Sequence, residues 1–280
     1  MARDLLPMVR EVLAGRYTVE REIGRGGAAR VFAARTPAGE LVALKVLHPQ
    51  LAVSVTADRF LREVQFVRRL EHPNIARLLD SGEGEWIVYY VMQFVEGPTL
   101  RMHLDRVRRA SISDTLHIAR NLLSALAHAH RQNIVHRDVK PENVVLSQVG
   151  AVLVDFGIAK AVADATMDRL TRSGFTVGTS AYMSPEQISG TEDIDPRTDI
   201  YSVGCLLFEC LAGRPPYDDP HDDLVLTRHR TAPVPDVRAI RADTPEGLAL
   251  AIARAMAKNR DERWPSAEAM DASMQALTRA

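Results

Sequence analysis

The spacing of apolar residues changes once along this 280-residue chain, and that change constrains the fold more than any other feature. From about position 17 to 94 the pattern is mostly that of strands, with one helical stretch over 58–70. After Gly97-Pro98 the period changes from two to 3.6 and stays largely helical to the end, as over 113–131. Strands followed by helices indicate an α+β protein in two parts rather than a repeating βαβ sheet. Residues 1–16 are expected to form a short helical extension.

Charge and composition narrow the function classes. The 35 Lys and Arg residues balance 36 Asp and Glu residues, whereas a nucleic-acid-binding protein usually has a basic surplus. The longest apolar stretches, such as 86–92, are too short to span a bilayer, and the first residues lack the apolar core of a secretory signal. Cys205 and Cys210 fit a reduced protein without disulfides. We therefore expect a cytoplasmic chain that binds neither nucleic acid nor membrane.

A glycine-rich run lies between two strand-like segments at 24–31, where the sequence reads Gly-Arg-Gly-Gly-Ala-Ala-Arg-Val. Glycines allow a hairpin to bring its backbone N–H groups against a polyphosphate without side-chain clashes. The segment 30–35 has the pattern of a strand, which favours such a hairpin over a dinucleotide-binding fold, where a helix would follow. An ordinary glycine-rich hairpin is the alternative for this motif taken alone.

A lysine and a glutamate in the first part have the pattern of an internal ion pair. In the predicted strand 41–47, Ala43 and Lys45 share one face, where a small residue leaves room for a flat base and an ammonium group can reach phosphates. In the predicted helix 58–70, Glu63 lies on the apolar stripe, and an inward-facing carboxylate is costly unless a cation meets it. Lys45 is the obvious partner. The alternatives are a surface lysine with a buried stem, and a glutamate at the edge of the stripe.

The run His-Arg-Asp-Val-Lys-Pro-Glu-Asn at 136–143 concentrates charged groups in a predicted loop. Phosphoryl transfer needs a carboxylate that orients an incoming hydroxyl, a cation that holds the γ-phosphate and oxygen ligands for magnesium. Asp138, Lys140 and Asn143 fit these three needs in turn. Twelve residues after Asn143, Asp155 ends a predicted strand and offers a second metal ligand. The loop therefore predicts a phosphotransfer site that uses magnesium.

Taken in order, these motifs resemble the protein kinase family, over roughly 17–277. The stretches at 178–187 and 199–204 resemble bacterial kinases of the eukaryotic-like type. Two departures, Ala29 for a glycine and Ser184 for an alanine, keep a small residue and remove no chemical role. The motifs that carry the resemblance are the glycine-rich run, Val-Ala-Leu-Lys at 42–45, Glu63, the run at 136–143, Asp-Phe-Gly at 155–157 and Ser-Pro-Glu at 184–186.

The resemblance implies a bilobal α+β fold and a serine/threonine protein kinase activity that transfers the γ-phosphate of ATP to protein hydroxyls. A small N-lobe over 17–94 is expected to hold a five-stranded antiparallel sheet and one main helix. A hinge is expected at 93–98, followed by a larger, mainly helical C-lobe over 98–277. Lys140 is typical of the serine/threonine class.

By similarity, Asp138 is the catalytic base or orienting carboxylate, and Lys140 stabilises the transferring phosphoryl group. Asn143 and Asp155 are expected to hold Mg²⁺ or Mn²⁺. Two structural roles also follow from the resemblance. Asp199 is expected to cap the catalytic-loop backbone from a helix over 197–211, and Glu186 is expected to pair with Arg263.

The resemblance also indicates how ATP is bound. Lys45, paired with Glu63, is expected to contact the α- and β-phosphates, and the hinge backbone at 93–95 to bond adenine. Met92 is expected to stand in front of the base as a bulky gatekeeper. The expected ATP-binding residues are Ile23, Gly24, Arg25, Gly26, Gly27, Ala28, Ala29, Val31, Ala43, Lys45, Met92, Gln93, Val95 and Leu146.

Regulation is expected in the segment 155–186. Arg137 immediately precedes Asp138, which resembles kinases switched on by phosphorylation of this segment. Thr171 and Ser173 are the expected sites, whereas Thr179 is expected to be structural; solvated hydroxyls without a regulatory role are the alternative. We further expect protein substrates, self-association for autophosphorylation, and a longer protein with a membrane anchor or sensor domain outside this chain.

Two other functions compete with that of an active protein kinase. A pseudokinase that acts as a nucleotide-sensing or scaffolding module is disfavoured, because Lys45, Asp138, Asn143 and Asp155 are all retained. A small-molecule phosphotransferase of related fold would be expected to lack the Ser-Pro-Glu element and the long segment before it.

Overall fold

A computed structural model describes residues 5–26, 29–47, 64–84, 87–156, 180–191 and 193–277. The chain divides into two compact units. The first, here called the N-unit, comprises residues 1–71, 76–95 and 157–176, and the second, the C-unit, comprises 72–75, 96–156 and 177–280.

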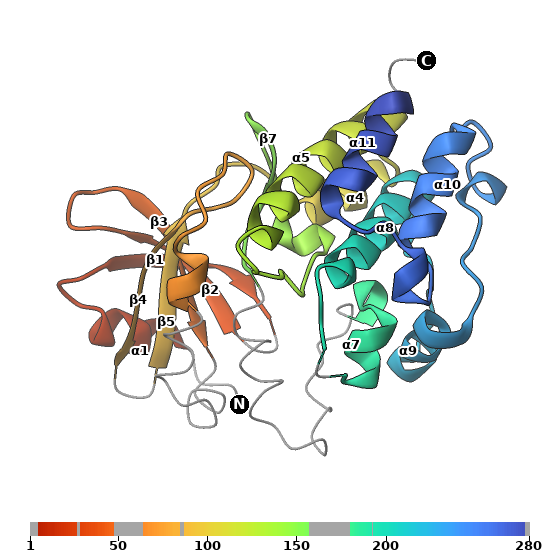
Figure 1. The fold of residues 1–280 in the computed structure, drawn as a ribbon. Coiled ribbons are helices and arrows are strands. Elements are labelled where there is room, and N and C mark those ends of the chain that lie inside the picture. Colours follow the sequence, from red (N-terminus) through yellow and green to blue (C-terminus); the bar gives the residue numbers. More distant parts are fainter. Residues whose placement is uncertain are drawn as a thin grey trace. The chain divides into compact units, whose positions relative to one another are not determined.

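The N-unit contains a five-stranded sheet in the order β1-β2-β3-β5-β4, with every neighbouring pair antiparallel (Figure 1). This confirms the five-stranded antiparallel sheet that the family resemblance implies. The strands are β1 (Thr18–Arg25), β2 (Ala29–Arg35), β3 (Leu41–Leu47), β4 (Leu78–Gly84) and β5 (Ile87–Gln93).

One face of this sheet is covered by helix α1 (Leu5–Val12). Leu5, Val9 and the following Leu13 recur every four residues and therefore lie on one stripe, which is buried. The sheet residues of the same core cluster are Val19, Phe32, Ala34, Val42, Leu44, Val46, Ile87, Tyr89 and Val91. A helix is thus present over part of the segment 1–16 that is expected to be helical, and it forms part of the hydrophobic core of the N-unit.

The helix predicted over 58–70 is described only from residue 64. Residues 64–67 are helical, and the chain then tightens, because the N–H of Leu70 donates to the carbonyl of Val67 at 3.0 Å. Such an i to i+3 bond closes the last turn of a helix in 3₁₀ form. The helix therefore ends earlier than predicted.

The C-unit is mainly helical, as expected, and carries one two-stranded hairpin. Short 3₁₀ turns lie at Pro141–Asn143, Ser180–Tyr182, Val237–Ala239 and Arg260–Glu262. Its helices and strands are α4 (Leu100–Val107), α5 (Ile112–His130), β6 (Val144–Ser147), β7 (Gly150–Leu153), α7 (Pro185–Ser189), α8 (Arg197–Ala212), α9 (Asp222–Thr231), α10 (Glu246–Ala255) and α11 (Ala267–Leu277).

Helix α8 forms the centre of the C-unit, with α5 and α10 packed against it (Figure 1). All of its residues after Arg197 are buried, which is why it shows little amphipathic pattern. Helix α5 begins one residue before its predicted start, because the Ser111 hydroxyl accepts the N–H of Asp114 at 3.0 Å and caps it. Cys205 and Cys210 are both buried in α8 as free thiols.

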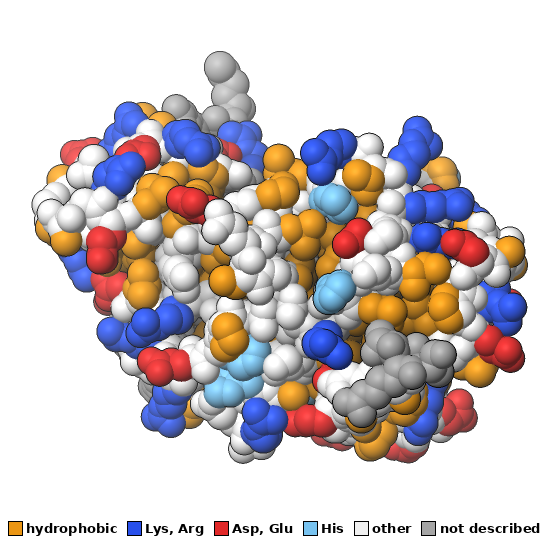
Figure 2. Space-filling view, turned by 90° about the horizontal axis from the view of Figure 1, so that it is seen from above, with side chains coloured by type: hydrophobic (Ala, Val, Ile, Leu, Met, Phe, Trp, Pro, Cys, Tyr) orange, Lys and Arg blue, Asp and Glu red, His pale blue; other side chains and the backbone are white. Residues whose placement is uncertain are grey.

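Two observations concern the predicted absence of membrane and nucleic-acid binding: the character of the helices and the distribution of surface charge. Among the described residues, none of the helices combines the length and the apolar character needed to cross a bilayer. Acidic and basic side chains are scattered together over the face drawn in Figure 2, in keeping with a formal net charge of −1.

Candidate active site

The predicted ATP-binding residues of the central strands share one face of the N-unit sheet. Val31 lies opposite Lys45, and Lys45 lies opposite Tyr90, whose ring centroid is 5.8 Å from the lysine Nζ. One row along, Ala43 lies opposite Met92. Directly opposed residues of antiparallel strands point to the same side. These residues therefore form one surface, on the face of the sheet away from α1.

The glycine-rich run forms the connection between β1 and β2. Gly24 pairs with Val31 across the hairpin, and the N–H of Gly26 donates to the carbonyl of Ala29 at 2.9 Å. Residues 27–28 lie outside the described part of the chain. The run is thus a strand-to-strand hairpin and not a strand-to-helix turn. Two further predicted residues of β1 are exposed: Ile23 and Arg25.

The segment predicted to be the hinge, 93–98, begins at the last residue of β5. The N–H of Gln93 donates to the carbonyl of Arg77, just before β4, at 2.8 Å, so this donor is not available to a base. Val95, two residues on, is half-buried.

Leu146 lies beside the end of the predicted hinge segment, at Gly97 and Pro98. Its N–H donates to the carbonyl of Pro98 at 2.9 Å. Gly97 has a φ of 142°, and a Cβ there would lie 2.1 Å from the carbonyl oxygen of Leu146. Only glycine allows the backbone at position 97 to approach the Leu146 carbonyl so closely, which explains why a glycine precedes Pro98 in the sequence.

Asn143 and Asp155, the predicted metal ligands, stand at the same end of the β6–β7 hairpin. Val144 begins β6 and pairs with Leu153, which ends β7. One step beyond this pair, the N–H of Val154 donates to the carbonyl of Asn143 at 2.9 Å. Asp155 follows with a φ of 66°, in the left-handed region. The hairpin therefore places two residues with oxygen-bearing side chains at the same end of its two strands.

Asp138 contacts two of the other predicted site residues. Its Oδ2 lies 2.9 Å from the Lys140 Nζ, and the same oxygen accepts the Nδ2 amide of Asn143 at 2.9 Å. Burial alone would lower the pKa of Lys140, but the carboxylates of Asp138 and Asp155 raise it above its ordinary value. The lysine is therefore a cation at neutral pH.

The backbone before Asp138 is held by a buried carboxylate. Arg137 has a φ of 65°, and its N–H and that of His136 donate to the two oxygens of Asp199, each at 2.8 Å. The ring of His130 lies 2.8 Å from Asp199 Oδ2. Although burial raises the pKa of Asp199, these donors lower it below its ordinary value. The predicted capping role of Asp199 is confirmed.

The ring of His136 supports the same loop from inside. Its Nδ1 accepts the N–H of Asp138 at 3.2 Å, and its centroid lies 4.6 Å from that of Phe156. Burial lowers the pKa of His136 below its ordinary value, in spite of the acidic groups around it. The imidazole is therefore neutral, as its acceptor role requires.

Helix α7, which carries the Ser-Pro-Glu element, is anchored by an ion pair. Arg263 Nη1 lies 2.7 Å from Glu186 Oε1, Nη2 lies 2.8 Å from Oε2, and the hydroxyl of Thr198 also donates to Oε1 at 2.7 Å. The Arg263 side chain is fully buried. The predicted pair of Glu186 and Arg263 is confirmed.

A contact to the loop 136–143, which is predicted to be catalytic, comes from Gln187, for which the sequence predicts no such role. Its Nε2 donates to the carbonyl of Arg137 at 2.8 Å. Ser184 and Gln187 fit the S-x-x-Q signature of a capping box, so the sequence contains a signal for the cap. It contains none for the bond to Arg137, fifty positions away.

Several predicted residues lie outside the described part of the chain. They include Glu63, so its pairing with Lys45 stays a prediction, and the regulatory candidates Thr171 and Ser173. Gly27, Ala28, Gly157 and Thr179 are also outside it.

Comparison with known proteins identifies the family. A family model described as "Protein kinase domain" matches residues 17–274. This chain belongs to the protein kinase family. A probable serine/threonine-protein kinase of Streptomyces coelicolor is 40% identical over 272 residues, which are 94% of this chain and 40% of that protein. Serine/threonine-protein kinase PrkC of Bacillus subtilis is 36% identical over 265 residues, again 94% of this chain and 40% of that protein.

This kinase domain therefore spans about two fifths of the length of those curated relatives. Among solved structures, that of Rad53 residues 1–466 in complex with AMP-PNP matches with a TM-score of 0.75 and 24% identity, covering 91% of this chain and 64% of that one. The match shows the protein kinase fold, and it confirms the bilobal architecture expected from the motifs.

A charged cluster beside the catalytic loop of this kinase domain was not predicted. Arg101 on α4 binds Glu209 on α8, with Nη1–Oε1 at 2.8 Å, and its Nε donates to Glu142 Oε1 at 3.0 Å. The Tyr182 hydroxyl donates to Glu209 and accepts Arg101 Nη2 at 2.6 Å. Burial raises the pKa of Tyr182 well above its ordinary value, and the nearby Glu209 raises it further. Because Glu142 follows Lys140 by two residues, this cluster borders the catalytic loop.

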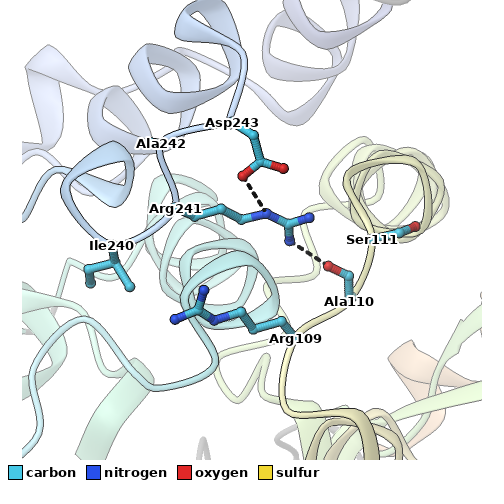
Figure 3. A pocket seen from close by; sticks show the side chains of 7 residues that line it. All are labelled: Arg109, Ala110, Ser111, Ile240, Arg241, Ala242 and Asp243. Atoms are coloured by element: carbon cyan, nitrogen blue, oxygen red, sulfur yellow. Dashed lines mark hydrogen bonds and ion pairs between the residues drawn. The ribbon is translucent and has the colours of Figure 1, made fainter.

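A hollow of about 700 Å³ lies elsewhere on the C-unit, between the segment before α5 and the residues that follow Val237–Ala239 (Figure 3). The Arg241 guanidinium crosses it, binding Asp243 at 3.2 Å and the carbonyl of Ala110 at 2.6 Å. None of the predicted site residues lines this hollow.

Proposed function

We propose that this kinase domain is an active serine/threonine protein kinase that transfers the γ-phosphate of ATP to hydroxyl groups of proteins. The observation that carries the proposal is the set of contacts made by Asp138, whose carboxylate meets both Lys140 and Asn143 at 2.9 Å. Its bacterial relatives are named serine/threonine-protein kinases, which supports the same activity.

In the proposed reaction, the acceptor oxygen forms a bond to the γ-phosphorus while the bond to the oxygen bridging the β- and γ-phosphates breaks. Asp138 orients the acceptor hydroxyl and receives its proton. Lys140, a cation held close to Asp138, stabilises the negative charge on the transferring group. Their mutual ion pair keeps both side chains in place before substrate binds.

The donor set fits magnesium. The Nδ2 of Asn143 donates to both the carbonyl and Oδ2 of Asp138, at 2.8 and 2.9 Å, which assigns Oδ1 as the oxygen left for a cation. Together with the Asp155 carboxylate it gives two oxygen ligands, and magnesium takes one or two such side chains plus phosphate oxygens. We propose that Asn143 and Asp155 hold Mg²⁺ or Mn²⁺, which neutralises charge on the β- and γ-phosphates when bound.

The N-unit supplies the proposed nucleotide contacts. Lys45, with Glu63 as its proposed partner, contacts the α- and β-phosphates, and the glycine-rich hairpin at 24–31 covers them. Val31 and Ala43 are on the same sheet face as Lys45, which supports their proposed contact with the base. We also propose that the backbone of the predicted hinge at 93–95 and the side chain of Leu146 contact adenine. The proposed kinase domain covers 17–277.

We also propose how this kinase domain is regulated and that it belongs to a longer protein. The side chain of Arg137 is proposed to bind a phosphate placed on Thr171 or Ser173 by autophosphorylation between associating copies. The curated relatives are longer than this chain, which supports the proposal that it is the kinase portion of a longer protein with an anchor or sensor.

The test is transfer of labelled phosphate from ATP, with magnesium, to the chain itself and to a generic protein substrate. The wild type is expected to label both, and Asp138→Asn to lose about 10²–10⁴-fold in rate, as for removal of a general base. Asparagine keeps the shape and the bond from Asn143, so it removes only the carboxylate. Absence of transfer by the wild type would refute the proposal, and labelling of small alcohols alone would indicate a small-molecule phosphotransferase. Mass spectrometry of the active protein tests Thr171 and Ser173.

A further inference from the structure

The peptide unit between Arg137 and Asp138 is held at both of its polar ends. Its N–H, that of Asp138, donates to His136 Nδ1 at 3.2 Å. Its carbonyl, that of Arg137, accepts the Gln187 Nε2 at 2.8 Å. Because a peptide unit is planar, two bonds at opposite ends fix its rotation about the chain. The Cα atom of Asp138 lies in this plane, so the orientation of the plane sets the position from which the Asp138 side chain extends.

The Gln187 amide has one orientation only. Its Oε1 accepts the N–H of Ser184 at 3.1 Å, and its Nε2 donates to the carbonyl of Arg137. A flipped amide would face an N–H with an NH₂ group and a carbonyl with an oxygen, and both bonds would be lost. The Ser184 hydroxyl accepts the N–H of Gln187 at 3.3 Å, which completes the capping box of α7.

The helix that carries Gln187 is itself fixed to the interior of the C-unit. The preceding residue, Glu186, is bound at 2.7 and 2.8 Å by the buried guanidinium of Arg263. The hydroxyl of Ser202, on α8, donates to the carbonyl of Tyr182 at 2.7 Å and holds the chain just before α7. Gln187 therefore extends from a firmly held support to the loop.

We propose that Gln187 is a positioning residue for the catalytic aspartate, acting through the Arg137 carbonyl. Arg137 has left-handed backbone geometry, which is strained for a residue with a Cβ and persists only where its surroundings determine it. Asp199 holds its N–H and Gln187 holds its carbonyl. A change at Gln187 lets this residue relax and moves Asp138 away from the acceptor hydroxyl. The inference rests on the proposed kinase activity.

Three variants separate positioning from helix stability. Gln187→Met removes both amide bonds at similar volume. Gln187→Glu keeps an oxygen for the Ser184 N–H but places a carboxylate against the Arg137 carbonyl. Ser184→Ala removes the capping hydroxyl and leaves the bond from Gln187 to Arg137. The assays are kcat and KM for ATP and for a protein substrate, the thermal midpoint, and hydrogen exchange of residues 134–139.

Both Gln187 variants are expected to lower kcat about tenfold, equivalent to about 1.4 kcal/mol in the barrier, with KM for ATP changed by less than about twofold. Exchange over 134–139 is expected to rise in both. Gln187→Glu is expected to keep a thermal midpoint near that of the wild type. Ser184→Ala is expected to lower the midpoint by a few degrees while kcat stays within about twofold.

The inference fails if both Gln187 variants keep kcat within about twofold of the wild type, or if Ser184→Ala loses kcat as much as they do. Inactivity of the wild type would instead refute the proposed function, and exchange over 134–139 would still decide whether Gln187 holds the loop. If Gln187→Met does not fold, the kcat and the exchange pattern of Gln187→Glu decide between positioning and helix stability, since its cap is retained.

Discussion

Replacement of Arg263 by methionine is expected to be among the most destabilising single changes in the described part of the chain. Its guanidinium is fully buried and meets the Glu186 carboxylate with two bonds, at 2.7 and 2.8 Å. The remaining donors bind the carbonyls of Ala257, Arg197 and Lys258 at 2.8, 3.1 and 3.2 Å. Arg263→Met therefore leaves a half-buried carboxylate and three carbonyls without this partner.

Removal of one member of a buried ion pair typically costs about 3–5 kcal/mol, because the other charge is left uncompensated. We expect Arg263→Met to fall in that range. Glu186→Gln should cost less, about 2 kcal/mol, since Arg263 keeps its three carbonyl acceptors. The double variant should be about 2 kcal/mol more stable than the sum of the two single-variant losses predicts, because no uncompensated buried charge remains.

Urea unfolding of the purified chain measures these free energies from the midpoint and slope. Burial raises the pKa of Glu186, but the bonds from Arg263 lower it below the ordinary value of 4.5 overall. A carboxyl with a depressed pKa stabilises the fold above its unfolded pKa, and this contribution disappears as the pH falls through the folded value. The difference between wild type and Arg263→Met should thus persist above about pH 4.5 and shrink below it. A loss under about 1.5 kcal/mol at pH 7, or strict additivity of the two variants, would refute the reasoning.

Two further changes test a buried ion pair and a buried neutral histidine. Arg101→Met leaves Glu209, which is 3% exposed, without its cation, and should cost about 3 kcal/mol in urea unfolding; a loss near zero would contradict the cluster. Burial lowers the pKa of His229, whose Nδ1 lies 2.8 Å from the Tyr201 hydroxyl, to about 3. Folding therefore requires neutral His229, so stability is complete above the unfolded pKa of about 6.5 and should fall by about 2 kcal/mol between pH 7 and 5. His229→Gln should reduce that pH dependence, and an unchanged profile would show that other groups cause it.

Local patterns predict local structure well in this chain. Alternation alone places Ala43 and Lys45 on one face of β3, because the pleat of a strand fixes its side-chain period at two. The helical pattern expected over 1–16 likewise agrees with the observed helix, whose apolar face carries Leu5, Val9 and Leu13. It does not say what covers that face, and the structure shows that the N-unit sheet does.

Whether a contact between residues far apart in the sequence can be predicted depends on the starting point, which is either a local pattern or the family resemblance. Asp199 and the loop backbone are 62 and 63 positions apart, and the motif resemblance, not a local pattern, predicts their contact. The bonds from Gln187 to Arg137 and from Arg101 to Glu209 span 50 and 108 positions. No spacing rule relates such residues, because their meeting depends on how whole helices pack. A capping signature or a lone arginine on a helix looks the same in the sequence whether or not a remote partner exists.

Arg137 combines two roles that act through different atoms. Its backbone is fixed at the N–H by Asp199 and at the carbonyl by Gln187, both at 2.8 Å, so its left-handed geometry depends on neighbours rather than on its own side chain. Its guanidinium is the group proposed to bind a phosphate on the segment 155–186. Because the backbone bonds use atoms that every residue except proline possesses, the side chain is released from holding the loop. The same position can therefore shape the catalytic loop at all times and respond to a phosphate only when one is present.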